Sequence, residues 1–129
     1  MDYEQFLAKV RDRGEYADPR EAEQVSRIVL ARLGERLPAG DAKDVAAQLP
    51  VDLQQPLLHT AATPASAAGV DEFLRRLASD LHATEETARW DASAVLTTLA
   101  DAITSEQLTQ TLSQLPTEFA VLFGKPDLA

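Results

Sequence analysis

The chain has 129 residues, of which 45% are apolar and 26% charged, a composition typical of a globular protein rather than a disordered segment. It contains no cysteine, which excludes disulfides, thiolate metal ligands and cysteine nucleophiles. With 12 basic and 21 acidic residues its net charge is −9, so a nucleic acid would be repelled unless a local basic patch opposed that field.

Residues 1–58 are predicted to form four helices and no strand. The apolar residues of 3–10 recur at spacings of three and four, which places them on one face of a first helix. A second helix begins at Asp18, a capping residue whose capping box Glu21 completes, and runs to about residue 37. A third, shorter helix ends at Pro50, which can also open a fourth helix that ends near residue 58.

A small, uncharged stretch, residues 59–69, is predicted to be a surface linker, because it lacks the large apolar side chains that would dock it. Beyond it the pattern of the first half returns. Residues 3–10 recur 67 positions later, and residues 22–57 recur 66 positions later after a one-residue deletion. The triplet Gln48-Leu49-Pro50 returns unchanged as Gln114-Leu115-Pro116, so four helices are predicted again in residues 70–129.

Four short helices make a thin core, and either half alone would be marginally stable. Packing the halves against each other would bury more apolar area. The predicted architecture is all-α: two tandem pseudo-symmetric four-helix repeats, residues 1–58 and 70–129, packed as one helical bundle-like domain.

Five segments carry a resemblance to a known family: DYEQFL (2–7), VLARL (29–33), AAQLP (46–50), DEFLRR (71–76) and QLP (114–116). They resemble a bacterial family, frequent in actinobacteria, that is catalogued as domain of unknown function 2267. The resemblance covers essentially the whole chain, and its motifs are structural. It implies a fold, but no activity, cofactor or catalytic residue.

The sequence offers no evident set of catalytic residues. The two histidines, His59 and His82, are predicted at a helix end and just before the next helix. Only His82 and Glu86 stand at a spacing that suits a metal on a helix, and one pair is too few for a site. No phosphate-binding loop, nucleophile elbow or dinucleotide fingerprint occurs. We therefore predict no catalytic, metal-binding or cofactor-binding residue, and no enzyme.

Other charged side chains are expected to serve the helices. The acidic pairs Glu21/Glu23 and Glu85/Glu86 lie in first turns, where capping and the helix dipole account for them. The second predicted helix carries four arginines that scatter over more than half its circumference, which predicts a solvated face rather than an anion or nucleic-acid patch. They are Arg20, Arg27, Arg32 and Arg36.

Trp90 breaks the pattern of its helix, because it points roughly 170° away from the centre of the apolar stripe. Ala94 and Thr97 flank it on the same side, and Ile28 is similarly off the apolar face in the first half. Two interpretations are open. Trp90 fills the seam between the repeats, or it is an exposed aromatic anchor for a protein partner or a homodimer.

The sequence thus predicts a cytoplasmic, non-enzymatic protein-interaction module that binds neither nucleic acid nor membrane. Its candidate partner-binding residues are Trp90, Ala94, Thr97 and Ile28. The alternative is a helical domain that binds a small molecule or apolar ligand between facing helices.

Overall fold

Eight α-helices, and no strand, make up the part of the chain that the computed structural model describes, residues 1–60 and 68–125. The all-α prediction is confirmed. Residues 61–67 of the predicted linker lie outside the described residues. The helices are α1 (Tyr3–Gly14), α2 (Pro19–Gly34), α3 (Ala39–Ala47), α4 (Val51–His59), α5 (Val70–Leu81), α6 (Glu85–Ala102), α7 (Ser105–Ser113) and α8 (Phe119–Leu122).

Side-chain caps fix where four of these helices begin. Asp2 accepts a hydrogen bond from the Gln5 N–H and forms a complete capping box with it. Asp18 accepts from the Glu21 N–H at 2.9 Å, but the reciprocal bond from the Asp18 N–H to the Glu21 side chain, which a capping box requires, is not formed among the described residues. Thr84 and Thr104 accept the equivalent backbone hydrogen bond in α6 and α7. The predicted starts of α2 and α6 therefore have the expected physical cause.

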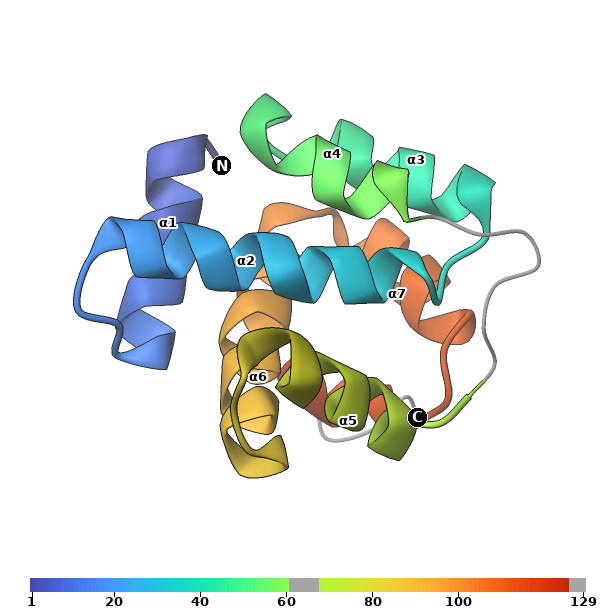
Figure 1. Ribbon diagram of the computed structural model, residues 1–129. Helices are drawn as coiled ribbons and strands as arrows, with labels where there is room; N and C mark the ends of the chain where they lie inside the picture. Colours follow the sequence, from blue (N-terminus) through green and yellow to red (C-terminus); the bar gives the residue numbers. More distant parts are fainter. Residues whose placement is uncertain (61–67, 126–129) are drawn as a thin grey trace.

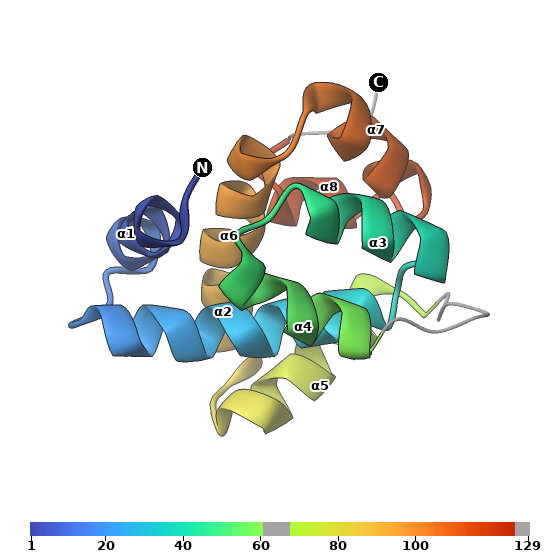
Figure 2. The same ribbon diagram turned by 90° about the horizontal axis from the view of Figure 1, so that it is seen from above.

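Helix α2 lies at the centre of the fold, with α3 and α4 on one side and α5 on the other (Figure 1). Helices α1 and α6 cross it, and α8 packs against α6 (Figure 2). The first and second halves interlock: α1 packs against both α2 and α6, and α5 packs against both α6 and α2. Helices α3 and α7 also contact each other.

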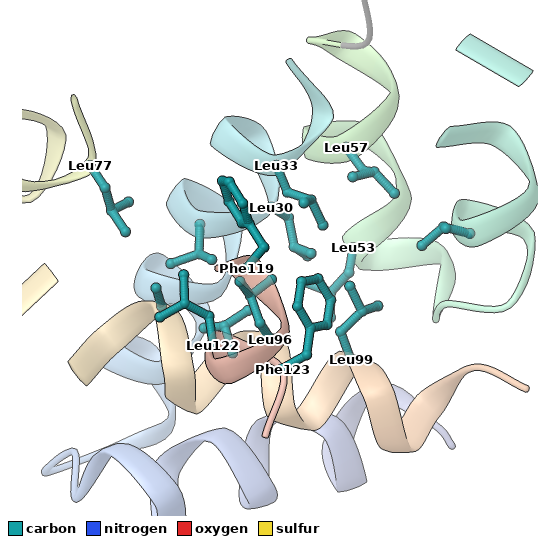
Figure 3. Close-up of a cluster of buried hydrophobic side chains, with 14 of the residues drawn as sticks. Leu30, Leu33, Leu53, Leu57, Leu77, Leu96, Leu99, Phe119, Leu122 and Phe123 are labelled. Carbon is teal, nitrogen blue, oxygen red and sulfur yellow. The ribbon is translucent and has the colours of Figure 1, made fainter. Parts of the chain in front are cut away.

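The core lies where α2, α4, α6 and α8 meet (Figure 3). Leucines from three of these helices surround two aromatic rings that α8 and the residue after it provide, Phe119 and Phe123, both fully buried. Phe119 meets Phe73 of α5 edge-on, with ring centroids 5.0 Å apart. The short α8 thus closes the core from the side opposite α2.

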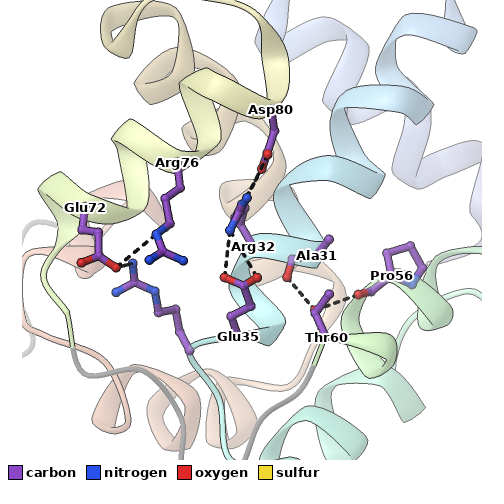
Figure 4. A network of polar contacts seen from close by, with 9 residues as sticks. Ala31, Arg32, Glu35, Pro56, Thr60, Glu72, Arg76 and Asp80 are labelled. Carbon is purple, nitrogen blue, oxygen red and sulfur yellow. Dashed lines mark hydrogen bonds and ion pairs between the residues drawn. The ribbon is translucent and has the colours of Figure 1, made fainter.

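A close backbone approach joins α2 and α4. Gly34 faces the Leu57 carbonyl and the Thr60 hydroxyl, and a side chain there would overlap both. The Thr60 hydroxyl lies 2.6 Å from the Ala31 carbonyl oxygen and 3.1 Å from that of Pro56 (Figure 4). The glycine and the threonine together fix the distance between the two helices.

Ion pairs join α2 to α5. Both oxygens of Asp80 accept hydrogen bonds from Arg32, which also bonds Glu35 (Figure 4). Further along, Arg36 is 2% exposed. Its guanidinium lies 5.5 Å from the Phe73 ring centre. It donates a hydrogen bond to the Ala68 carbonyl and pairs with Glu72 at 3.7 Å. Burial lowers the pKa of Arg36. A buried cation thus ties the start of α5 to the end of α2.

The longest described helix, α6, has 18 residues. Neither it nor any other helix within residues 1–60 and 68–125 combines the length and the apolar character needed to span a bilayer.

Candidate functional site: the Trp90 face

Trp90 lies where the end of α1 meets the first turns of α6. Its indole N–H donates a hydrogen bond of 3.0 Å to the Gly14 carbonyl, and 51% of the residue is exposed. The indole therefore has features of both interpretations: one edge is held between helices of the two halves, and the rest faces outward.

A second exposed apolar residue stands beside it. Val121 of α8 is 58% exposed, and it lines with Trp90 a hollow of about 340 Å³. Trp90 also lines a second hollow, of about 230 Å³, together with Arg13, Ala94 and Thr97. We call this surface the Trp90 face and define it by the residues that line the two hollows: Arg13, Glu86, Arg89, Trp90, Ser93, Ala94, Thr97, Val121 and Leu122.

A part-buried hydrogen bond joins Tyr16 to Asp91, the neighbour of Trp90 in the sequence of α6. The Tyr16 hydroxyl donates a hydrogen bond of 2.6 Å to Asp91, which is 6% exposed and follows Trp90 on α6. Burial raises the pKa of Tyr16 and that of Asp91, and the neighbouring carboxylate raises that of Tyr16 further. The Tyr16 ring packs directly on Gly14, where a Cβ would overlap it. This packing holds the carbonyl that Trp90 binds.

An arginine of α1 closes the edge of the Trp90 face. Arg13 donates to the Thr98 hydroxyl at 2.9 Å and to Asp101 at 2.5 Å, both on α6. The Arg13 hydrogen bond lowers the pKa of Asp101. The crossing of α1 over α6 is thus fixed at three points: Arg13, Tyr16 and the Gly14 carbonyl.

The structure brings three of the four candidate partner-binding residues together. Trp90, Ala94 and Thr97 line the same hollow, although Ala94 is buried and the Thr97 hydroxyl lies 3.4 Å from the Leu122 carbonyl. Ile28 lies on α2, where it packs against the core, and it does not line either hollow.

Sequence reasoning missed Val121 as part of this surface. It lies in the run Phe119-Ala120-Val121-Leu122-Phe123, in which the other four residues are buried. A run that is apolar throughout has no periodicity to show which side chain points outward. Glu86 and Arg89 were also not expected here, because each is individually a typical surface residue of a helix.

The two histidines lie at helix ends. His59 is the last residue of α4, and His82 ends α5 with a left-handed backbone, φ 54°. Among the described residues no group of three or more His, Asp and Glu side chains is arranged to hold a metal. Glu23 accepts a hydrogen bond from the Tyr3 hydroxyl and lies 3.8 Å from Arg27.

One buried carboxylate stands between α3 and α7. Asp41 is 6% exposed; its Oδ1 accepts a hydrogen bond of 3.2 Å from Gln107, and its Oδ2 has no hydrogen-bond partner in the described part of the chain. Burial raises the pKa of Asp41. A polar hollow of about 410 Å³ lies beside this contact, lined by Gln107 but not by Asp41.

A further hollow runs along the exposed side of α1. It measures about 590 Å³, and Tyr3, Leu7, Ala8 and Pro19 give it an apolar floor with charged residues at the rim. Arg11, at that rim, is already bonded to the Ala17 carbonyl at 3.0 Å. This volume is in the range of small-molecule sites.

Comparison with known proteins identifies the family to which the chain belongs. No curated protein matches the chain. A family model described as an uncharacterized conserved protein, DUF2267, matches residues 3–122. The match begins at the first residue of α1 and ends at the last residue of α8, so it includes all eight helices and the Trp90 face. The resemblance seen in the sequence is therefore confirmed, and the chain belongs to the DUF2267 family.

Proposed function

We propose that this chain is a cytoplasmic, non-enzymatic protein-interaction module whose contact surface is the Trp90 face. The observation that carries the proposal is the exposure of Trp90 and Val121 side by side, at 51% and 58%. Tryptophan contributes disproportionately to interface energy, because it buries a large rigid surface at low entropic cost. The two hollows that Trp90 lines are recesses in which side chains of a partner can pack.

The electrostatics of the arginines support a protein rather than a nucleic acid as partner. Arg13, Arg32 and Arg36 are each engaged with residues of this chain, and Arg27 lies 3.8 Å from Glu23. Nucleic-acid binding requires a cluster of free cations, and Arg89 is the one basic residue of the Trp90 face that makes no ion pair or hydrogen bond within the described residues. A net charge of −9 adds to the unfavourable field.

A photo-crosslinking residue at Val121 tests the proposal in the cells from which the chain comes. The Val121 residue is 58% exposed, so we expect the substitution to leave the fold in place. The matched control is position 51 on α4, where Val51 is 76% exposed but does not line either hollow. We expect a crosslinked product from position 121 and none from position 51. No product from position 121, or equal products from both, contradicts the proposal.

The second candidate is binding of a small apolar molecule in the hollow of about 590 Å³ along α1. Its apolar floor favours a hydrophobic ligand over a charged one. Two-dimensional NMR of the labelled chain with a library of apolar fragments tests it. Saturable shifts confined to Leu7, Ala8 and their neighbours support this function, and shifts spread over the surface contradict it.

We also propose that the helices form two pseudo-symmetric repeats that pack as one unit, residues 1–58 and 70–129. Glu15 and His82, 67 positions apart, end α1 and α5 with the same left-handed backbone, φ 56° and 54°. Helices α3 and α7 are 66 positions apart at both ends. The contact of α1 with α6 and that of α5 with α2 are also equivalent under this repeat, which supports a two-fold relation.

The experiment for the repeats uses the two halves as separate polypeptides. We expect residues 1–60 and 68–129 each to be largely unfolded alone and helical when mixed, because each provides the partner of the other's first helix. Circular dichroism measures the gain in helicity. Independent folding of either half contradicts the single packed unit.

A further inference from the structure

We infer that the Trp90 face binds a second copy of this chain, so that two Trp90 faces meet across a two-fold axis. The inference rests on the proposed function, and it names the partner. A surface that meets itself must provide both a projection and the recess that receives it. Trp90 is 51% exposed and lines both hollows, so its indole provides the projection and the adjoining hollows provide the recesses.

The larger hollow, of about 340 Å³, has an apolar side that suits an indole. Val121 and Leu122 form its apolar side, and Ser93 is small enough to let a second helix approach. The indole of one copy can displace the water in the recess of the other. Because the contact is two-fold symmetric, each copy inserts its indole into its partner.

The charges on the Trp90 face are self-complementary. Glu86 and Arg89 both line the larger hollow beside Trp90, and neither makes a hydrogen bond or ion pair within the described part of the chain. A two-fold axis beside Trp90 directs Glu86 of each copy towards Arg89 of the other. The pair cancels in charge, and Arg13 and Asp101 at the edge already neutralise each other at 2.5 Å.

This local neutrality distinguishes a second copy from a charged partner. The chain as a whole carries −9, so a basic partner would bind best on an acidic surface, and two copies repel each other except where the contact is neutral. The apolar contact is small, which predicts a reversible dimer with a dissociation constant on the order of 10 μM rather than a permanent one.

Sedimentation equilibrium of the full chain, from roughly 1 μM to 1 mM, tests the inference. We expect the mass to rise from 14.0 kDa towards twice that value. The Arg89→Glu variant sets two acidic residues of each copy against two of the other, and we expect it to weaken the dimer at least tenfold. The double variant Glu86→Arg/Arg89→Glu restores opposite charges, and we expect it to recover most of the affinity.

The matched control is Arg75→Glu, an exposed position on α5 that changes the net charge by the same amount away from the Trp90 face. We expect it to dimerise like the wild type. A chain that stays at 14.0 kDa at 1 mM overturns the inference, and so does equal weakening by Arg75→Glu and Arg89→Glu.

Crosslinking from position 121 separates failure of this inference from failure of the proposed function. A product of twice the chain's mass that contains only this chain supports the second copy. A product with a different protein, from a chain that stays monomeric, overturns the second copy and leaves the interaction face standing. No product contradicts both.

Discussion

Asp41 of α3 accepts a hydrogen bond from Gln107 of α7, and the two residues are 66 positions apart in the sequence. That separation is the offset of the proposed repeat, so each residue is the other's counterpart and the two meet at the axis that would relate the halves. One counterpart is charged and the other is not. Equivalent positions of the two proposed repeats therefore contact each other without the repulsion that two carboxylates would produce.

The burial of Asp41 leads to a pH-dependent prediction. Because its folded-state pKa is raised, the unfolded chain releases the proton first as pH rises, and stability is lost above the unfolded value of about 3.9. We expect Asp41→Asn to be more stable than the wild type by about 1 kcal/mol at pH 7 and equal to it near pH 3. Urea unfolding at both pH values measures the difference. A variant that is less stable at pH 7 would show that the ionised carboxylate stabilises the fold.

Two glycines in helices are expected to respond in opposite ways to alanine. A Cβ at Gly34 overlaps the Leu57 carbonyl, whereas nothing lies within 4 Å of one at Gly40. We expect Gly34→Ala to destabilise the protein by about 1–3 kcal/mol. Gly40→Ala should stabilise it by about 0.5–1 kcal/mol, because alanine loses less backbone entropy. Thermal unfolding of both variants checks this, and an equal effect from the two would contradict the close approach of α2 and α4.

The Tyr16–Asp91 pair makes a third prediction. In Tyr16→Phe the buried Asp91 carboxylate loses the 2.6 Å hydrogen bond and gains no substitute. We expect a loss of about 1–3 kcal/mol in the free energy of unfolding. Combining Tyr16→Phe with Asp91→Asn in a double-mutant cycle isolates the interaction. Strictly additive losses would mean that the two side chains do not depend on each other.

Arg36 is expected to tolerate neither truncation nor conservative exchange. Alanine removes the packing against Phe73 and Phe119 together with the bond to the Ala68 carbonyl, and we expect a loss of about 2–4 kcal/mol. Lysine keeps the charge but has no planar group to pack against the two rings. Arg36→Met, which keeps the apolar stem, should be less costly than Arg36→Ala. Denaturant unfolding ranks the three, and a lysine variant as stable as the wild type would refute the role of the rings.

The core could be predicted from the sequence, because its physical cause is local. Phe6, Val10 and Leu33 follow helical spacing and are fully buried, and Pro50 precedes the helix that it was expected to open. A buried stripe leaves its period in the sequence whatever it packs against.

The polar contacts could not be predicted, because each depends on a partner far along the chain. Tyr16 and Asp91 are 75 positions apart, and Arg13 and Asp101 are 88 apart. The identity of an aspartate or glutamate in the sequence does not show whether its carboxylate is buried or exposed. The candidate site could be predicted only in part. The direction of Trp90 on its own helix follows from local sequence, whereas the exposure of Val121 depends on how α8 packs against α6.

The interlocked packing of α1 and α6 sets an order of events during synthesis. Helix α1 is made before α6, but the surface that Arg13, Tyr16 and Gly14 require belongs to a helix that begins at Glu85. A nascent chain from which residues 1–60 but not α6 have emerged leaves the apolar side of α2 that faces α6 open to water. Helix α1 therefore completes its packing only when α6 has emerged from the ribosome.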